Sequence, residues 1–311
     1  MAGVKPGLAV DLAGLQLAAP VLVASGCFGT GRELGGLVDL HRIGGIVTRT
    51  ITAAPRRGGP GPRVAETASG MLSAVGWQNP GVEAFIAEEL PRMVRPGLAV
   101  LVSVGGASLE EFVRVAGALR AAEGVASLEV ALGGPDEELG LPSFAARPER
   151  AAEIVGAVAR LSAVPVFAKL PACVSELAET AHACVRAGAH GVTLIDGVPA
   201  MAVDSATMRP ALGAVVGFLS GPAIRPIALR AVHEIALALP DVPVMGVGGV
   251  STGDDAVELL LAGAWAVQVG TATLVDPAAP VEVAQGILGY LKAKGLTSPA
   301  DLRGALRGRA R

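Results

Sequence analysis

The sequence predicts an α/β fold, a (β/α)8 TIM barrel with an N-terminal β-hairpin and long loops on its C-terminal face. Short runs of β-branched residues alternate with longer amphipathic runs along the chain, which is typical of repeated strand–helix units. Eight strand candidates occur, and this number favours a closed barrel over an open sheet. The 311 residues exceed the usual size of one core, but barrels commonly exceed about 250 residues. One domain over residues 1–311 is therefore predicted.

The first element expected is a hairpin in residues 8–20, whose alternating apolar positions suit a plug at the bottom of the barrel. Each barrel strand is then predicted from a short run rich in Val, Leu and Ile. The eight strands are expected, in order, at 21–25, 45–50, 99–104, 127–132, 165–170, 191–196, 243–248 and 264–270. Amphipathic runs between them carry Pro or a capping residue near several starts and Gly near several ends. They predict helices at 81–93, 109–122, 148–162, 175–188 and 222–239.

Two connections are too long for simple loops: residues 51–80 after the second strand and residues 197–221 after the sixth. Both would leave the barrel at the C-terminal ends of its strands, where barrel enzymes place their active sites. Long ordered connections usually bind ligands or cover a site. We therefore expect these two segments to form part of a functional site.

Composition and charge exclude several classes of function. A net charge of −3 and a pI near 5.9 give no strong field, so neither nucleic acid nor a membrane surface is an expected partner. No apolar run approaches the roughly 20 residues of a membrane span, and the N-terminus lacks a signal-peptide pattern, which indicates the cytoplasm. Three widely spaced cysteines argue against a disulfide framework or an iron–sulfur cluster in this chain. The four histidines lack metal-site spacing, so no metal is expected.

Glycine-rich turns follow the last two predicted strands. Gly246, Gly248 and Gly249 form the first turn, and Gly270 with Thr271 forms the second. Backbone without Cβ atoms lets N–H groups close on an anion, and the helix N-termini that follow add partial positive charge. In (β/α)8 barrels the loops after the last two strands commonly hold phosphate groups. The turns therefore indicate a phosphate site, while plain tight turns are the alternative.

Two positively charged residues stand at the C-terminal ends of predicted barrel strands, on the face where barrel enzymes place their active sites. Lys169, at the end of the fifth predicted strand, is the only lysine between Lys5 and Lys292. It is placed to donate to an anionic or electron-rich cofactor atom, with a solvent-facing lysine on the barrel rim as the alternative. Arg49, at the end of the second predicted strand, offers a fixed positive charge to a carboxylate or a phosphate.

Five segments together carry a resemblance to a known family. They are ASGCFG (24–29), APRRGGPGPRVAETASGMLSAVGWQNPG (54–81), FLSGPAIRP (218–226), GVGGV (246–250) and VGTA (269–272). The chain resembles, as a divergent member, the FMN-carrying catalytic subunit of class 1B dihydroorotate dehydrogenases. The resemblance implies an FMN-containing barrel of pyrimidine biosynthesis, in which a hydride passes from dihydroorotate to the flavin. It therefore supplies a cofactor for the phosphate turns.

The resemblance also implies a role for individual residues by position. The set implied for FMN is Ser25, Arg49, Thr50, Ser103, Lys169, Ile195, Gly221, Gly248, Gly249, Gly270 and Thr271. Among these, Lys169 would meet the edge of the isoalloxazine and tune the electronics of the flavin. The set implied for the substrate is Arg49, Ser73, Gly76, Trp77 and Asp196.

The departures from the family pattern all lie around the substrate. The family carries a proton-abstracting cysteine in a motif like ELNISCPN, where this chain reads EVALGGPD at 129–136, with Gly134 in the place of the cysteine. Substrate asparagines of the family are replaced by Ser73, Ala131, Asp136 and Asp196. Asparagine both donates and accepts hydrogen bonds, whereas an ionised carboxylate only accepts them. Because glycine at position 134 cannot accept a proton, the usual base, worth about 10²- to 10⁴-fold in rate, is missing.

Other groups are candidates for the missing base. Cys173 lies close in sequence to Lys169, and a neighbouring cation favours the ionised thiol, although such a cysteine is also a common packing residue. Asp136 is the second catalytic candidate, and Asp196 and Ser143 are further ones.

Three functions are compatible with these residues. The first is an FMN-dependent oxidoreductase of the CH–CH group that acts on dihydroorotate with a rearranged base. The second is an FMN enzyme of the same fold with a different substrate, and the third is a catalytically inactive flavin or phosphate binder. The resemblance further implies a homodimer core and a second subunit that carries FAD and a [2Fe–2S] cluster.

Overall fold

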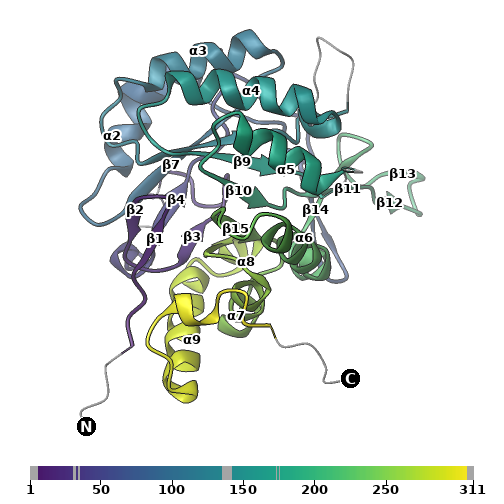
Figure 1. The fold of residues 1–311 in the computed structure, drawn as a ribbon. Helices are drawn as coiled ribbons and strands as arrows, with labels where there is room; N and C mark the ends of the chain where they lie inside the picture. The colour runs from purple at the N-terminus through teal and green to yellow at the C-terminus, as the bar shows by residue number, and fades with distance from the viewer. Residues whose placement is uncertain are drawn as a thin grey trace.

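The computed structural model describes residues 6–30, 33, 36–134, 142–172, 174 and 176–306, and it confirms the predicted barrel. Eight parallel strands form a closed barrel in chain order, and the last strand pairs with the first (Figure 1). The strands are β3 (Val21–Val23), β4 (Gly45–Val47), β7 (Ala99–Val104), β8 (Ser127–Ala131), β9 (Val166–Leu170), β10 (Gly191–Leu194), β15 (Val244–Val247) and β16 (Ala266–Val269). Each lies inside a run that the sequence predicts as a strand.

The predicted N-terminal hairpin is confirmed as β1 (Val10–Leu12) and β2 (Leu15–Leu17). Its buried Leu12 and Leu17 pack against a layer of side chains inside the barrel. The layer consists of Leu22, Val47, Leu101, Phe167, Met245 and Ala266. The hairpin therefore closes the bottom of the barrel, and the C-terminal ends of the strands form the opposite, open end.

Helices surround the barrel, and their apolar faces pack with the strands in one main core. They are α3 (Leu109–Leu119), α4 (Pro148–Leu161), α5 (Leu177–Arg186), α6 (Arg225–Ala238), α7 (Gly253–Ala262), α8 (Thr271–Val275) and α9 (Ala279–Lys294). Short 3₁₀ turns occur at η1 (Leu40–Arg42), η3 (Phe144–Ala146), η4 (Pro222–Ile224) and η5 (Pro299–Leu302). None of the described helices has the length and apolar character that a membrane crossing requires.

The helix predicted at 81–93 contains a wider turn. It consists of α1 (Val82–Ala84), a π-helical turn η2 (Phe85–Glu89) and α2 (Leu90–Met93). Pro91 lacks a backbone N–H, so it has no donor for the carbonyl of Ala87 and the regular ladder of hydrogen bonds is interrupted. The predicted helix is therefore present, with a π turn before its proline.

The two long connections pair with each other at the open end of the barrel. The first contributes β5 (Val64–Thr67) and β6 (Gly70–Ser73), and the second contributes β11 (Val198–Ala200) and β14 (Gly217–Ser220). They form one antiparallel sheet in the order β11-β14-β6-β5. A small hairpin, β12 (Val203–Asp204) with β13 (Arg209–Pro210), projects beside it (Figure 1). The sequence predicts loops here, and the structure differs because strand pairing between distant segments leaves little local signal.

Candidate active site

One cavity of about 610 Å³ lies at the open end of the barrel, lined by the strand ends and by the sheet of the two long connections. Every residue predicted for FMN lines it: Ser25, Arg49, Thr50, Ser103, Lys169, Ile195, Gly221, Gly248, Gly249, Gly270 and Thr271. The residues predicted for the substrate line it too: Arg49, Ser73, Gly76, Trp77 and Asp196. The predicted catalytic residues Cys173 and Asp136 lie outside the described residues.

The glycine turns after β15 and β16 offer backbone N–H groups to the cavity. Gly248 and Gly249 have φ values of +128° and +75°, which residues with a side chain rarely adopt. A Cβ on Gly249 would lie 2.5 Å from the Cβ of Arg225, so the turn also lacks room for a side chain. Within the described part of the chain, the N–H groups of Gly249 and Gly270 donate no hydrogen bond. Such free donors suit an anion such as phosphate.

Lys169 reaches the cavity from β9 and pairs with a carboxylate buried inside the barrel. Its Nζ atom lies 3.4 Å from Oε1 of Glu129 on β8, and Gln268 on β16 donates from Nε2 to Oε2 of Glu129 at 2.8 Å. Burial by itself would lower the pKa of Lys169, but Glu129 and then Asp196 outweigh this effect and the pKa is raised. Lys169 therefore keeps its positive charge at neutral pH.

Arg49 follows β4 and is the second cation at the cavity wall. Its guanidinium is half-buried and has no hydrogen bond or ion pair to any described residue. Beside it, the Oγ1 atom of Thr50 and the Oγ atom of Ser103 lie 3.0 Å apart in a buried hydrogen bond. Against the effect of burial, the charge of Arg49 helps to lower the pKa of the Glu33 carboxyl, but its N–H groups stay available, which suits an anionic ligand on the cavity wall.

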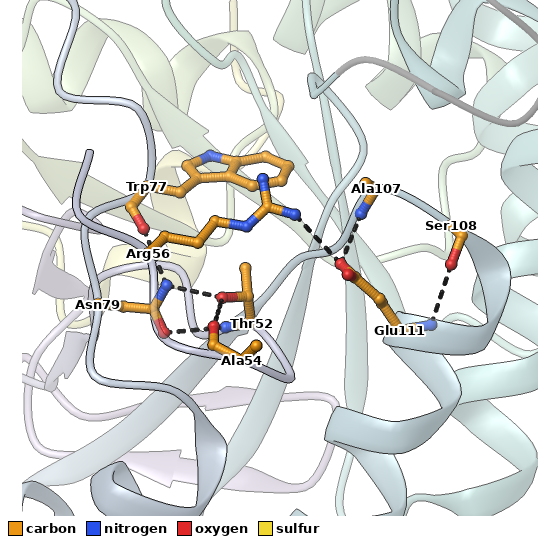
Figure 2. Close-up of polar contacts among 8 residues, drawn as sticks. All are labelled: Thr52, Ala54, Arg56, Trp77, Asn79, Ala107, Ser108 and Glu111. Carbon is orange, nitrogen blue, oxygen red and sulfur yellow. Dashed lines mark hydrogen bonds and ion pairs between the residues drawn. The ribbon is translucent and has the colours of Figure 1, made fainter. Parts of the chain in front are cut away.

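The loop between β6 and α1 carries Trp77 to the cavity, and buried Asn79 holds this loop in place (Figure 2). The Nδ2 group of Asn79 donates to the carbonyl of Trp77 and to Oγ1 of Thr52, both at 2.8 Å. Its Oδ1 atom accepts from the N–H groups of Thr52 at 3.2 Å and of Gly81 at 2.8 Å. Asn79 therefore uses both ends of its amide to fix the backbone on either side of it.

The guanidinium of Arg56 lies over the ring of Trp77 and restricts the position of the indole. Its guanidinium carbon lies 5.8 Å from the ring centroid, within the range of a cation–π contact. Its Nη2 atom lies 3.2 Å from Oε2 of Glu111 on α3, and the same oxygen accepts from the N–H of Ala107 at 2.8 Å (Figure 2). Helix α3 thereby orients Arg56, and Arg56 orients the indole.

The end of β8 carries two cavity-lining glycines, Gly133 and Gly134. The Oδ2 atom of Asp196 lies 2.7 Å from the place of a Cβ on Gly133, and Oδ1 accepts from the N–H of Gly197 at 2.9 Å. Among the described cavity-lining residues, Asp196 has the only carboxylate. The thiol of Cys27 also lines the cavity, but burial raises its pKa to about 11, although Lys169 opposes this effect, so the thiol stays protonated near neutral pH. Asp196 is therefore the carboxylate among the described cavity-lining residues that lies beside Gly133.

Sequence reasoning missed four residues that support the cavity: Arg56, Asn79, Glu111 and Glu129. Glu129 had a local signal, because it is a charged residue within the apolar run SLEVAL. Asn79 is the only asparagine in the chain, which the sequence also shows. The pairing of Arg56 with Glu111 depends on segments far apart and has no local signal. No group of three His, Cys, Asp or Glu in the described part of the chain is placed to hold a metal ion.

Comparison with known proteins identifies the family. The sequence profile of dihydroorotate dehydrogenase matches residues 7–291. Dihydroorotate dehydrogenase B (NAD(+)), catalytic subunit, of Pelobacter propionicus is 43% identical over 302 residues, which cover 97% of this chain and 99% of the relative. Proteins of the same name from Geotalea daltonii and Geobacter sulfurreducens are 43% and 41% identical, again over 97% of this chain and 99% of each relative. The chain therefore belongs to the dihydroorotate dehydrogenase family of flavin-dependent oxidoreductases, which act on a CH–CH group.

Proposed function

We propose that this chain is an FMN-dependent catalytic subunit that oxidises dihydroorotate to orotate. One observation carries the proposal: a single cavity joins the free N–H groups of the glycine turns, the protonated Lys169 and the guanidinium of Arg49, which forms no hydrogen bond to a described residue. These groups suit a cofactor with a phosphate and an electron-accepting ring, together with a substrate that carries a carboxylate. The choice of dihydroorotate follows the names of the relatives.

FMN fits the residues that line the cavity. The free N–H groups of Gly249 and Gly270 would hold its phosphate beside Gly248, in a cradle that a Cβ on Gly249 would obstruct. Lys169 would place a positive charge beside its ring system. When bound, FMN supplies the acceptor for a hydride. The protein binds it, sets the charge around it and covers the reaction with the sheet of β5, β6, β11 and β14.

The substrate would be held by its carboxylate and by its ring amides. Arg49 would pair with the carboxylate, since its guanidinium forms no hydrogen bond or ion pair with a described residue. The hydroxyl of Ser73 both donates and accepts, so it suits a ring amide. Oxidation of a CH–CH bond removes a proton as well as a hydride, and Oδ2 of Asp196 would accept that proton. Cys173 and Asp136 stay predictions for the same role.

A second function is favoured by the glycine at position 134. An FMN enzyme of the same fold with another substrate, such as a different cyclic amide or an unsaturated carbonyl compound, would keep the phosphate turns and Lys169. Such an enzyme would differ from dihydroorotate dehydrogenases in the residues around the substrate. In this chain those residues include two glycines, Gly133 and Gly134, and the carboxylate of Asp196. A catalytically inactive flavin binder is the remaining alternative.

Partners follow from the relatives, which are named as catalytic subunits of an NAD(+)-linked enzyme. We infer that this chain forms a homodimer core and passes electrons to a second subunit with FAD and a [2Fe–2S] cluster. A cytoplasmic location remains an expectation from the sequence.

An anaerobic visible spectrum of the purified protein, recorded before and after addition of dihydroorotate, tests the proposed function. Flavin bands that bleach with dihydroorotate support it, and Asp196→Asn should then keep the flavin and lose most of the bleaching rate. Flavin that stays oxidised overturns dihydroorotate as the substrate and favours the second function, an FMN enzyme with another substrate. A colourless protein that takes up no added FMN overturns the flavin site itself.

A further inference from the structure

The indole of Trp77 occupies the space that a side chain at position 134 would need. A Cβ built on Gly134 would lie 2.5 Å from Cζ2 of Trp77 and closer still to Cη2. A Cβ on Gly105, which follows β7, would lie 3.2 Å from Cζ3 of the same ring. The six-membered edge of the indole therefore packs directly over the ends of β7 and β8.

This position of the indole is fixed from two directions. Trp77 has a φ of +52°, an uncommon left-handed conformation, and its carbonyl accepts a hydrogen bond from Nδ2 of Asn79. On the ring side, Arg56 covers the indole and is itself paired with Glu111 (Figure 2). Arg56 and Asn79 also share two backbone hydrogen bonds, so one connected set of contacts holds the loop and the ring, and the indole forms a rigid wall of the cavity.

The order of strands places this wall next to the carboxylate site. In the barrel β4 pairs with β7, and β7 pairs with β8. Arg49 follows β4, whereas the indole edge covers Gly105 after β7 and Gly134 after β8. Arg49, Trp77 and Gly134 line one cavity, so a six-membered ring whose carboxylate meets Arg49 would present a neighbouring ring position to Trp77. That position is a carbon, because a ring N–H would lose its hydrogen bond against the apolar indole edge.

We propose that Trp77 determines the substrate specificity of the cavity. It admits planar ring carboxylates that carry no substituent on the ring carbon next to the carboxylate-bearing carbon, and it excludes those that do. This proposal rests on the proposed function, since it takes the cavity to bind FMN and a dihydroorotate-like ring. A methyl group at that carbon would meet an indole that has no room to move toward Gly134 or Gly105.

Titration of the FMN-loaded protein with orotate and with 5-methylorotate, followed by the change in flavin absorbance, tests the specificity. Wild type should bind orotate at least about 10-fold more tightly than 5-methylorotate, and Trp77→Leu should reduce this preference to about 3-fold or less. Val75→Ala removes apolar volume from the same loop and cavity wall and is the matched control, which should keep the wild-type preference. A preference unchanged in Trp77→Leu overturns the proposal.

The packing of Trp77 against position 134 has a test that needs no substrate. Gly134→Ala should lower the Tm of the FMN-loaded protein by about 4 °C when Trp77 is present, and by much less in the Trp77→Leu background. Gly133→Ala is the control, because its Cβ would meet Asp196 and its cost should be the same in both backgrounds. Equal costs of Gly134→Ala in both backgrounds contradict the rigid wall.

Failure of the proposed function gives a different result. If orotate perturbs the flavin in neither wild type nor Trp77→Leu, then dihydroorotate is not the substrate and the ligand class proposed for Trp77 falls with it. If orotate binds only to Trp77→Leu, then Trp77 still selects ligands, but against orotate itself, and the proposed substrate is wrong.

Discussion

The Nζ atom of Lys169 lies 3.4 Å from Oε1 of Glu129 inside the barrel, where both side chains are buried. Gln268 donates to the other carboxylate oxygen of Glu129 at 2.8 Å, and no further described residue bonds to Oε1. The pair therefore depends on each partner: Glu129, with a smaller effect of Asp196, stabilises the protonated Lys169 against the effect of burial. This relationship gives two predictions.

Removal of Lys169 should destabilise the chain more than removal of the whole pair. In Lys169→Met the buried Glu129 has no compensating charge, and we expect a loss of about 3–5 kcal/mol in the free energy of unfolding. In the double variant Lys169→Met with Glu129→Gln, no buried charge remains and the loss should be clearly smaller. Chemical denaturation of the FMN-free proteins measures both values. Equal losses in the single and double variants would contradict a dependence on charge.

The stabilisation by Lys169 should disappear at high pH. Its pKa is raised above the ordinary value of 10.5, so the protonated lysine is favoured by folding. The resulting stability is fully present below pH 10.5 and is lost as the pH rises through the higher pKa of the folded state. The difference in unfolding free energy between wild type and Lys169→Met should therefore be constant from about pH 7 to 10 and shrink above that range. A difference that widens in alkali would show the opposite sign of the shift.

Gly249→Ala should weaken FMN binding. The φ of +75° is strained for alanine, and the new Cβ would lie 2.5 Å from that of Arg225, so the turn must move and its N–H groups lose their aim at the phosphate. We expect the Kd for FMN to rise at least about 10-fold, measured by fluorescence titration of the FMN-free protein. Gly289→Ala in α9 is the matched control, because its Cβ would meet nothing within 4 Å. An unchanged Kd in Gly249→Ala would remove the turn from the phosphate site.

Asn79→Ala should destabilise the loop that carries Trp77. The substitution removes four hydrogen bonds and leaves the buried N–H groups of Thr52 and Gly81 without an acceptor. We expect a loss of about 2–4 kcal/mol in the free energy of unfolding, with higher sensitivity of the loop to proteolysis. Gln78→Ala, at the exposed neighbouring position, should cost less than about 1 kcal/mol. Similar losses at both positions would mean that Asn79 is not the residue that holds the loop.

The sequence predicts the features that local patterns encode. The strand run at 165–170 and the hairpin at 8–20 are visible in apolar periodicity, and the turn at Gly248 and Gly249 is visible in glycine content. The sheet at the open end was not predicted, because Leu72 pairs with Leu219 from the other long connection and neither run is distinctive alone. The contact of Trp77 with position 134 likewise requires the fold, since it joins a loop to the end of β8.

That contact leads to the last prediction, which concerns the base that the family resemblance implies at position 134. In Gly134→Cys a thiol has no room beside Trp77, so the rate of flavin reduction by dihydroorotate should stay at the wild-type level. In the double variant Trp77→Leu with Gly134→Cys the thiol has space, and we expect the rate to rise about 10²-fold. Trp77→Leu alone introduces no proton acceptor and should give no such gain. Anaerobic stopped-flow spectroscopy measures all three rates. A full gain in Gly134→Cys alone would mean that the indole moves aside readily and that Trp77 is no barrier at this position.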